Sequence, residues 1–354
     1  MGWHLRALLL CERAVEVVAA NRSTFADPHK LSEFCGAVDA IVHLAGVNRG
    51  DDSVVHETNV ALADQLLAAC TATGAKPHIV FANSTHRARP SAYGTSKRIA
   101  GEKFAVWAQN TGATFTNLVL PHVFGERCRP FYNSAVATFC HQLANHETPT
   151  VIVDGELELI HAQRVAEQIK TTIDSAAGGD VRVDGSEIRV SEVLAKLRYM
   201  SEQYGQQLIP ELASALDLDL FNSYRGYLYP QSFPVNLAVR SDARGGLFEA
   251  VKTLHGGQCF ISTTQPGITR GNHFHRRKLE RFLVLQGEAL IRVRRLNSSD
   301  VCEFKVSGRT PQYIDIPTLH THNITNVGTG ELTTLFWAQE IFDAAHPDTY
   351  PERV

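Results

Sequence analysis

The sequence predicts an α/β domain built on a parallel sheet, followed by an all-β domain of the barrel or jelly-roll class. Its 354 residues exceed what one hydrophobic core usually organises, which indicates two domains. In the first part, short apolar runs alternate with longer stretches of helical periodicity, as in parallel-sheet proteins. After Pro230 and Pro234 the pattern changes to short strands separated by Gly, Pro and Asn turns. We therefore predict domains at residues 1–232 and 236–354.

The composition is that of an ordinary globular protein. Hydrophobic residues make up 44% of the chain, charged residues 20%, and the net charge is -3. Without a basic excess, we expect neither nucleic acid nor a membrane as a partner, but a small molecule. The seven cysteines are odd in number and form no C-x-x-C pair, which favours a cytoplasmic location over a disulfide framework. No run approaches the roughly 20 apolar residues of a transmembrane helix.

The elements of the first domain follow from periodicity. The chain opens with an amphipathic helical pattern that mixes Arg and Glu into its apolar positions. Residues 38–44 and 79–82 are expected to form buried strands, and residues 60–72 and 96–109 to form helices. We expect the first of these two helices to open at Asn59.

The most specific motif of the first domain is Tyr93-Gly-Thr-Ser-Lys97. If Tyr93 begins a helix, Lys97 lies one turn further on the same face, so its charge can stabilise a phenolate. Thr85, with Ser84 as the alternative hydroxyl, would orient a carbonyl while Tyr93 exchanges a proton and a nicotinamide exchanges hydride. The same spacing also occurs on solvated helix faces, so the interpretation depends on the context of the motif.

Further stretches in a fixed order supply that context. They are His43-Leu44-Ala45-Gly46, Asn59-Val60, Gly101-Glu102 and Leu120-Pro121-His122-Val123-Phe124-Gly125. Together with the Tyr/Lys motif they resemble an extended short-chain dehydrogenase/reductase of the nucleotide-sugar branch. The resemblance implies a Rossmann-type fold in which Tyr93, Lys97 and Thr85 are catalytic.

The same resemblance implies the cofactor contacts. It places Ala45 and Gly46 along the adenine side, Val123 beside the nicotinamide, and Lys97 in the cofactor site as well. Arg22 follows the expected second strand, where it would lie near a 2′-phosphate and favour NADPH over NADH. The alternative is an ordinary surface arginine.

The chain departs from this family at its beginning. These enzymes open with a strand and a G-x-x-G-x-x-G turn that holds the pyrophosphate. Here Gly2-Trp3-His4-Leu5 resembles the last glycine of that turn and the helix after it. The first strand is therefore expected to be missing from the middle of the sheet, which would leave two unpaired edges. Either the true start lies upstream, or the reductase domain is impaired.

The second domain carries a metal-binding pattern. It reads Gly267-x5-His273-x-His275-x4-Glu280-x6-Gly287, then Pro317-x4-His322-x3-Asn326. His273 and His275 would project to one face of a strand, and Glu280 and His322 would come from other strands. Three imidazoles and one carboxylate can hold a divalent cation, with zinc as the first choice. The pattern resembles the cupin signature, except that Leu319 stands where Gly is usual and His320 follows, which would shift the turn that positions His322.

Two further stretches are candidates for substrate binding. Asp242-Ala-Arg244-Gly245-Gly-Leu-Phe248-Glu249 resembles the D-x-R-G-x-x-x-E segment of cupin nucleotide-sugar epimerases. There the arginine contacts sugar or phosphate oxygens and the aromatic ring stacks, so we assign Arg244 and Phe248 to the substrate site, with Arg270 as a weaker candidate. In the PFYNS segment, Asn133 and Ser134 would hydrogen-bond the diphosphate or the sugar. For Arg244 the alternative is an Asp/Arg pair in a turn, and for Arg270 it is a solvated surface cation. For Asn133 and Ser134 it is that they are ordinary polar residues of a loop.

Taken together, the two halves resemble the bifunctional capsular polysaccharide enzymes that make UDP-2-acetamido-2,6-dideoxy-L-talose on the way to UDP-N-acetyl-L-fucosamine. HLAGVNR at 43–49, YGTSK at 93–97, PFYNSAVATFC at 130–140, PGITRGNHFH at 266–275 and FDAAHPDTY at 342–350 carry the match. The resemblance implies a homodimer whose cupin domain epimerises C3 of a UDP-4-keto-6-deoxy-HexNAc. Its reductase domain then reduces the C4 ketone with NADPH. The alternatives are an epimerase with a nucleotide-blind first domain and a non-enzymatic sensor of a UDP-sugar.

Overall fold

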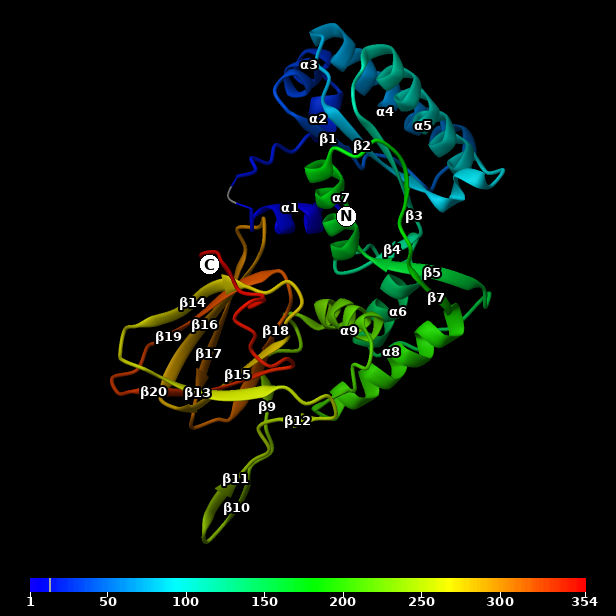
Figure 1. The fold of residues 1–354 in the computed structure, drawn as a ribbon. Helices are drawn as coiled ribbons and strands as arrows, with labels where there is room; N and C mark the ends of the chain where they lie inside the picture. The colour runs from blue at the N-terminus through cyan, green and yellow to red at the C-terminus, as the bar shows by residue number, and fades with distance from the viewer. Residues whose placement is uncertain (13) are drawn as a thin grey trace. The chain divides into compact units, whose positions relative to one another are not determined.

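The structure of the chain is a computed structural model that describes residues 1–12 and 14–354, and these form two compact units (Figure 1). The first unit consists of Met1–Phe124, Phe131–Ser134 and Gly155–Arg189. The second unit consists of Gly125–Pro130, Ala135–Asp154 and Val190–Val354. The domain boundary at residues 232–236 stays a prediction. Among the described residues, no helix is both long and apolar enough to cross a membrane.

A four-stranded parallel sheet forms the centre of the first unit, with strand order β1-β2-β3-β6. The strands are β1 (Ala40–His43), β2 (His78–Ser84), β3 (Phe115–Leu120) and β6 (Gly179–Arg182). The two buried strands predicted at 38–44 and 79–82 are confirmed as β1 and β2. A small second sheet contains β4 (His122–Phe124), β5 (Glu156–His161) and β7 (Ser186–Arg189).

Helices cover both faces of the parallel sheet, so β2 is buried on each side. Its Ile79 and Phe81 belong to a core shared with α3 (Pro28–Gly36), α4 (Asp52–Thr73) and α5 (Ala92–Thr111). Its Val80 and Ala82 belong to a second core, shared with α1 (Gly2–Leu9) and α7 (Ala162–Ser175). Neighbouring strand residues point to opposite faces, which gives the three-layer arrangement of a Rossmann-like domain.

Three expectations about the first unit are wrong. Helix α4 begins at Asp52 and not at Asn59, because the acidic Asp52 in the first turn favours a helix start there. Residues 14–21 form no strand, and their side chains are exposed. Arg22 therefore does not follow a second strand but opens the short helix α2 (Arg22–Phe25), which the Asn21 side chain caps. Of the described strands only β2 pairs with β1, which leaves one edge of β1 open instead of the two unpaired edges expected.

Helices and antiparallel sheets both contribute to the second unit. Its helices are α6 (Ala135–Ala144), α8 (Val190–Gly205) and α9 (Ala215–Leu228). One five-stranded sheet has the order β13-β20-β15-β18-β9, and the other has the order β17-β16-β19-β14-β21. The strands of the first sheet are β13 (Gln258–Thr264), β20 (Leu332–Ala338), β15 (Glu280–Gln286), β18 (Gln312–Ile316) and β9 (Val235–Asn236). Those of the second are β17 (Val301–Ser307), β16 (Glu288–Arg295), β19 (His320–Asn326), β14 (Thr269–Phe274) and β21 (Tyr350–Pro351).

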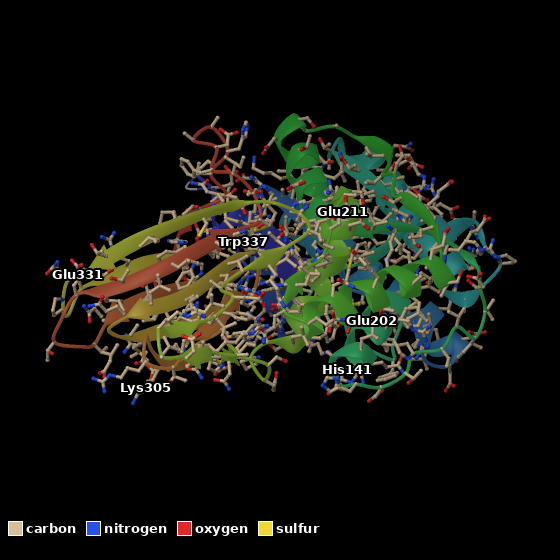
Figure 2. All side chains as sticks on the ribbon, turned by 90° about the horizontal axis from the view of Figure 1, so that it is seen from below. His141, Glu202, Glu211, Lys305, Glu331 and Trp337 are labelled. Carbon is tan, nitrogen blue, oxygen red and sulfur yellow. The ribbon has the colours of Figure 1, made fainter. Side chains whose placement is uncertain are left out.

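The two five-stranded sheets share one hydrophobic core. It takes Phe282 from β15 and Phe336 from β20 on one side, and Ile291 from β16 and Ile324 from β19 on the other. In Figure 2, Lys305 and Glu331 point outward from the β-rich part, whereas Trp337 is buried. The all-β expectation for the C-terminal part is therefore met by two facing antiparallel sheets.

A buried ion pair links this β-rich part to helix α8. Arg281 on β15 donates to Asp315 on β18 over 2.7 and 2.8 Å, and the Tyr204 hydroxyl on α8 donates to the same carboxylate over 2.5 Å. The Arg281 guanidinium also stacks on the Tyr313 ring at 3.5 Å. Burial would raise the pKa of Asp315, but the Arg281 charge outweighs it and holds that pKa below its usual value.

We predict that Arg281→Met destabilises the protein by about 3–5 kcal/mol, because Asp315 is then left as a buried charge without its partner. Arg292→Met on β16 is the control, since the Arg292–Glu303 pair is exposed and should contribute less than about 1 kcal/mol. Urea unfolding followed by tryptophan fluorescence measures both, because Trp337 lies opposite Arg281 in the sheet. Equal losses for the two variants would contradict the prediction.

Candidate functional site

Four side chains from three strands of the second unit gather in one place. His273 lies on β14, His275 directly follows it, Glu280 opens β15 and His322 lies on β19. One ligand atom of each lies within 4.8 Å of the others. The Glu280 Oε2 atom is 3.1 Å from His275 Nε2 and 3.3 Å from His322 Nε2. The structure thus brings together the four predicted metal ligands.

Two backbone features aim these side chains. The β14–β19 register shifts between Gly271 and His273, and Asn272 at that bulge has φ 61. A bulge of this kind changes the direction in which the following side chain points. Leu319 has φ 59 and therefore adopts the left-handed conformation itself. The expected shift of the turn at Leu319 is wrong, because His322 still reaches the cluster.

Hydrogen bonds to backbone carbonyls orient two of the imidazoles. His275 Nδ1 lies 2.6 Å from the Asp348 carbonyl, and His322 Nδ1 lies 3.1 Å from the His320 carbonyl. A carbonyl only accepts, so each Nδ1 carries the hydrogen and each Nε2 offers its lone pair to the cluster. Buried His322 Nε2 has no hydrogen-bond partner among the described residues, as expected of a ligand atom that faces a cation.

The protonation states also suit a metal ion. Burial and the neighbouring imidazoles lower the pKa of His273 to about 3, and burial lowers the pKa of His322. Burial would raise the pKa of Glu280, but the adjacent His275 and His322 imidazoles outweigh it and hold that pKa well below its usual range. Neutral imidazoles around an ionised carboxylate are the donor set of a divalent cation site.

A cavity of about 400 Å³ opens onto the cluster. His273, His275 and Glu280 line it together with apolar rings and a few charged groups. The other lining residues are Gln258, Phe260, Ser262, Arg270, Gly271, Lys278, Phe282, Ile324, Phe336, Ala338, Glu340, Phe342 and Thr349. Its size and its mixture of apolar walls with few polar groups are typical of a small-molecule site.

In the first unit, Tyr93 and Lys97 lie on helix α5, which Ser91 caps through the backbone N–H of Gly94. Lys97 is buried, donates to the Ala82 carbonyl over 2.7 Å, and has its Nζ 6.0 Å from the centre of the Tyr93 ring. Burial lowers the pKa of Lys97 to about 8. The expectation that both side chains face one side of a helix is met.

Ser84 is the hydroxyl next to Tyr93. Burial raises the pKa of Tyr93, and a hydrogen bond with Ser84 opposes that effect. Ser84 ends strand β2, and Thr85 begins the short 3-10 helix η1 (Thr85–Ala88). Of the two hydroxyls considered in the sequence, the contact to Tyr93 therefore comes from Ser84, the alternative.

The loop after β1 lies against this pair. Asn59 on α4 accepts from the Val47 N–H and donates to the Val47 carbonyl, each over 2.8 Å. A Cβ atom on Gly46 would lie 2.8 Å from Asn59 Oδ1 and 4.0 Å from Lys97 Nζ, so only glycine fits there without a shift. Gly46 thus lies beside the buried Lys97, and the cofactor contacts of Ala45 and Gly46 stay predictions.

Family models match both parts of the chain. The model described as NAD dependent epimerase/dehydratase family matches residues 7–183, which is half of the chain. The chain belongs to this family. The model described as Polysaccharide biosynthesis C-terminal domain matches residues 240–350.

Relatives of this epimerase/dehydratase match over nearly its whole length. A UDP-2-acetamido-2,6-beta-L-arabino-hexul-4-ose reductase of Pseudomonas aeruginosa is 32% identical over 356 residues, covering 99% of this chain and 95% of the relative. The crystal structure of the capsular polysaccharide assembling protein CapF from Staphylococcus aureus is 32% identical, with TM-score 0.65, and covers 100% of this chain and 97% of that one. A structure of CapF with the inhibitor 3-isopropenyl-tropolone is 30% identical, with TM-score 0.60 and coverage of 100% and 96%.

The other residues predicted for the first site of this epimerase/dehydratase differ in their surroundings. Arg22 is exposed at the start of α2, and Val123 lies on β4 against the core of α1 and α7. Asn133 is exposed, and its carbonyl lies 2.9 Å from His122 Nε2, while Ser134 is buried. Their roles stay predictions.

The three residues predicted to bind substrate in the second domain, Arg244, Phe248 and Arg270, lie in different places. Arg270 lines the cavity and donates to Thr264 Oγ1 and the Thr263 carbonyl, each over 3.0 Å. Arg244 lies in the hairpin of β10 (Arg240–Asp242) and β11 (Gly245–Leu247), where its side chain is 91% exposed and pairs with Asp242. Neither Arg244 nor Phe248 is among the residues lining the cavity of its own chain.

Sequence reasoning missed several residues that build the cavity. Asp348 accepts from the backbone N–H groups of Arg276, Arg277 and Lys278 over 2.8–3.1 Å, which fixes the turn between β14 and β15. Its place in FDAAHPDTY was a signal, because that stretch carried part of the family resemblance. The cavity-lining ring of Phe336 had no signal beyond an apolar strand pattern.

We predict one divalent cation per chain, bound by the four-residue cluster. Loss of a residue that only hydrogen-bonds a metal ligand typically weakens metal binding by roughly 10–100-fold. His275→Ala removes a ligand itself, so it should weaken metal binding by more than that. His346→Ala is the matched control, because the His346 side chain is 79% exposed and pairs only with Asp343 among the described residues. Metal content by mass spectrometry measures both, and full occupancy in His275→Ala would rule the site out.

We also predict that Lys97→Met stabilises the protein at pH 7, by about 1–3 kcal/mol. The folded-state pKa of about 8 lies below the unfolded value of roughly 10.4, so burying the charge is unfavourable below pH 8. That penalty disappears as pH rises from about 8 to 10, so the stabilities of wild type and Lys97→Met should become equal near pH 10. Lys103→Met on the same helix is the control, since Lys103 is exposed and pairs with Asp64. Thermal unfolding at pH 7 and pH 10 tests the difference.

Proposed function

We propose that this chain is a bifunctional nucleotide-sugar enzyme. Its cupin-like C-terminal part epimerises C3 of a UDP-4-keto-6-deoxy-HexNAc, and its N-terminal part then reduces the C4 ketone with NADPH. The product is UDP-2-acetamido-2,6-dideoxy-L-talose, in the pathway to UDP-N-acetyl-L-fucosamine. The observation that carries the proposal is the presence, in one chain, of Tyr93 beside a buried Lys97 and of a cavity onto the His273, His275, Glu280 and His322 cluster.

The epimerisation suits the cavity of the second unit. A proton at C3 is acidic because the resulting carbanion delocalises onto the neighbouring C4 ketone, provided that the negative oxygen is stabilised. The four clustered side chains would hold a divalent cation, with zinc as the first choice, and such a cation would supply positive charge beside the substrate. Arg270 at the same cavity would bind phosphate or sugar oxygens.

The reduction suits the first unit. When bound, NADPH supplies the hydride for the C4 carbon. Tyr93 would give the proton to the ketone oxygen, while the charge on buried Lys97 favours the phenolate that remains. Ser84, which reaches Tyr93, would orient the ketone, with Thr85 next to it. Ala45, Gly46 and Val123 would contact the cofactor, and Arg22 would select its 2′-phosphate; Asn133 and Ser134 would contact the diphosphate or the sugar.

The hairpin of β10 and β11 supports a homodimer within this proposal. Figure 1 shows it reaching away from the two five-stranded sheets of its unit, and all six of its strand residues are exposed. A two-stranded hairpin is marginally stable alone in water, so a second copy is its expected support. In a homodimer, Arg244 would then enter the cavity of the partner and contact the sugar or phosphate there, whereas Phe248 packs against Leu283 and Tyr313 of its own chain.

A second candidate is an epimerase whose first unit does not bind a nucleotide. The observation that favours it is the region before β1, where residues 14–21 form no strand and β1 pairs with β2 alone among the described strands. This candidate predicts solvent exchange at C3 without any affinity for NADPH.

Both candidates are tested by incubating a UDP-4-keto-6-deoxy-HexNAc with metal-loaded protein and NADPH in deuterated water, followed by mass spectrometry of the UDP-sugar. We expect a product that has gained two hydrogens and carries carbon-bound deuterium from solvent. Deuterium without reduction would support the second candidate. An unchanged substrate would contradict both.

Two variants separate the half-reactions. Tyr93→Phe keeps the ring but removes the proton donor, so we expect deuterium incorporation with reduction slowed by about 100-fold or more. His275→Ala should abolish deuterium incorporation. Reduction at the wild-type rate in Tyr93→Phe would exclude Tyr93 as the acid.

A further inference from the structure

Lys278 is a buried cation whose role the proposed half-reactions leave unassigned. It lies in the turn between β14 and β15, two residues before Glu280, and is only 8% exposed. Its side chain nevertheless lines the cavity that holds His273 and Glu280. Burial of a charged side chain is costly, so its place at a ligand cavity points to a use there.

The hydrogen bonds of the Lys278 ammonium go to neutral acceptors. Its Nζ donates to the Pro347 carbonyl over 2.9 Å and to Thr349 Oγ1 over 3.5 Å, and both acceptors are neutral. Among the described residues no carboxylate forms an ion pair with it, whereas the adjacent Arg277 pairs with Glu340 over 3.0 Å. An ammonium has three N–H donors, so one remains for a ligand in the cavity.

The turn holds this ammonium in a fixed position. The backbone N–H of Lys278 donates to Asp348 Oδ2 over 2.8 Å, and its Nζ is bonded to the two residues on either side of Asp348. The side chain also shares its cavity with two members of the cluster, His273 and Glu280. A donor fixed in this way needs no reorganisation during a reaction.

We propose that Lys278 is a catalytic residue whose ammonium contacts the ketone oxygen that becomes negative when the C3 proton of the sugar is removed. This inference rests on the proposed epimerase activity of the same cavity. In the step, a base takes the C3 proton, the C–H electron pair forms the C3–C4 double bond, and the carbonyl π pair moves to the oxygen. Protonation of C3 from the opposite face reverses these shifts. Lys278 acts as a fixed positive charge throughout and gives up no proton.

The test is solvent exchange at C3 in metal-loaded protein, measured by mass spectrometry with a UDP-4-keto-6-deoxy-HexNAc in deuterated water without NADPH. Lys278→Gln should lower kcat for exchange by about 100- to 1000-fold, as loss of one donor to a developing oxyanion does, and change KM little. Its metal content should equal that of wild type. Lys305→Gln is the control, because Lys305 is exposed on β17. This variant should catalyse exchange at the wild-type rate.

A second variant covers the case in which Lys278→Gln loses its metal or its fold. Lys278→Ala is assayed with increasing ethylammonium, and a saturable rise in exchange supports the inference while a flat response overturns it. Exchange in folded Lys278→Gln within threefold of wild type would also overturn it. If the wild-type protein shows no exchange, the proposed epimerase activity is wrong. If wild type is active and the Lys278 variants are equally active, only the role of Lys278 is wrong.

Discussion

The buried ion pair between Arg281 and Asp315 determines which way strand β15 faces, and the metal cluster depends on that direction. Neighbouring residues of a strand point to opposite faces, so Arg281 pairs with Asp315, which also accepts from Tyr204 on α8, while Glu280 points into the cavity. A slip of one residue would move the Glu280 carboxylate out of the cluster and place a guanidinium there. A charged residue without its partner inside the fold costs several kcal/mol, so the native register is strongly favoured.

Backbone carbonyls position the charged and donor groups in both sites. The Ala82 carbonyl accepts from Lys97, the Pro347 carbonyl from Lys278, and the Asp348 carbonyl from His275. A carbonyl orients a cation but carries no net charge, so the positive charge of each lysine stays available to a substrate or cofactor. A carboxylate in the same place would neutralise it.

Spacing and periodicity in the sequence predict several parts of the molecule. The strands β1 and β2, the helix carrying Tyr93 and Lys97, and the four metal ligands all follow from spacing and periodicity. The predictions that failed concern residues whose conformation is set by contacts with parts of the chain far away in the sequence. The apolar pattern of residues 14–21 suits a strand, but a strand needs a neighbour to complete its hydrogen bonds. Leu319 adopts a conformation typical of glycine because its buried side chain and its bond to the His275 carbonyl fix it there.

The two compact units are interleaved along the chain, which passes from one to the other after residues 124, 130, 134, 154 and 189. No single breakpoint in the gene therefore separates the two units into independent fragments. During synthesis on a ribosome, the first unit cannot be complete until residue 189 has emerged, and by then segments of the second unit wait for partners beyond residue 190. Those early segments include the apolar helix α6, whose buried face must stay protected until helices α8 and α9 have been made.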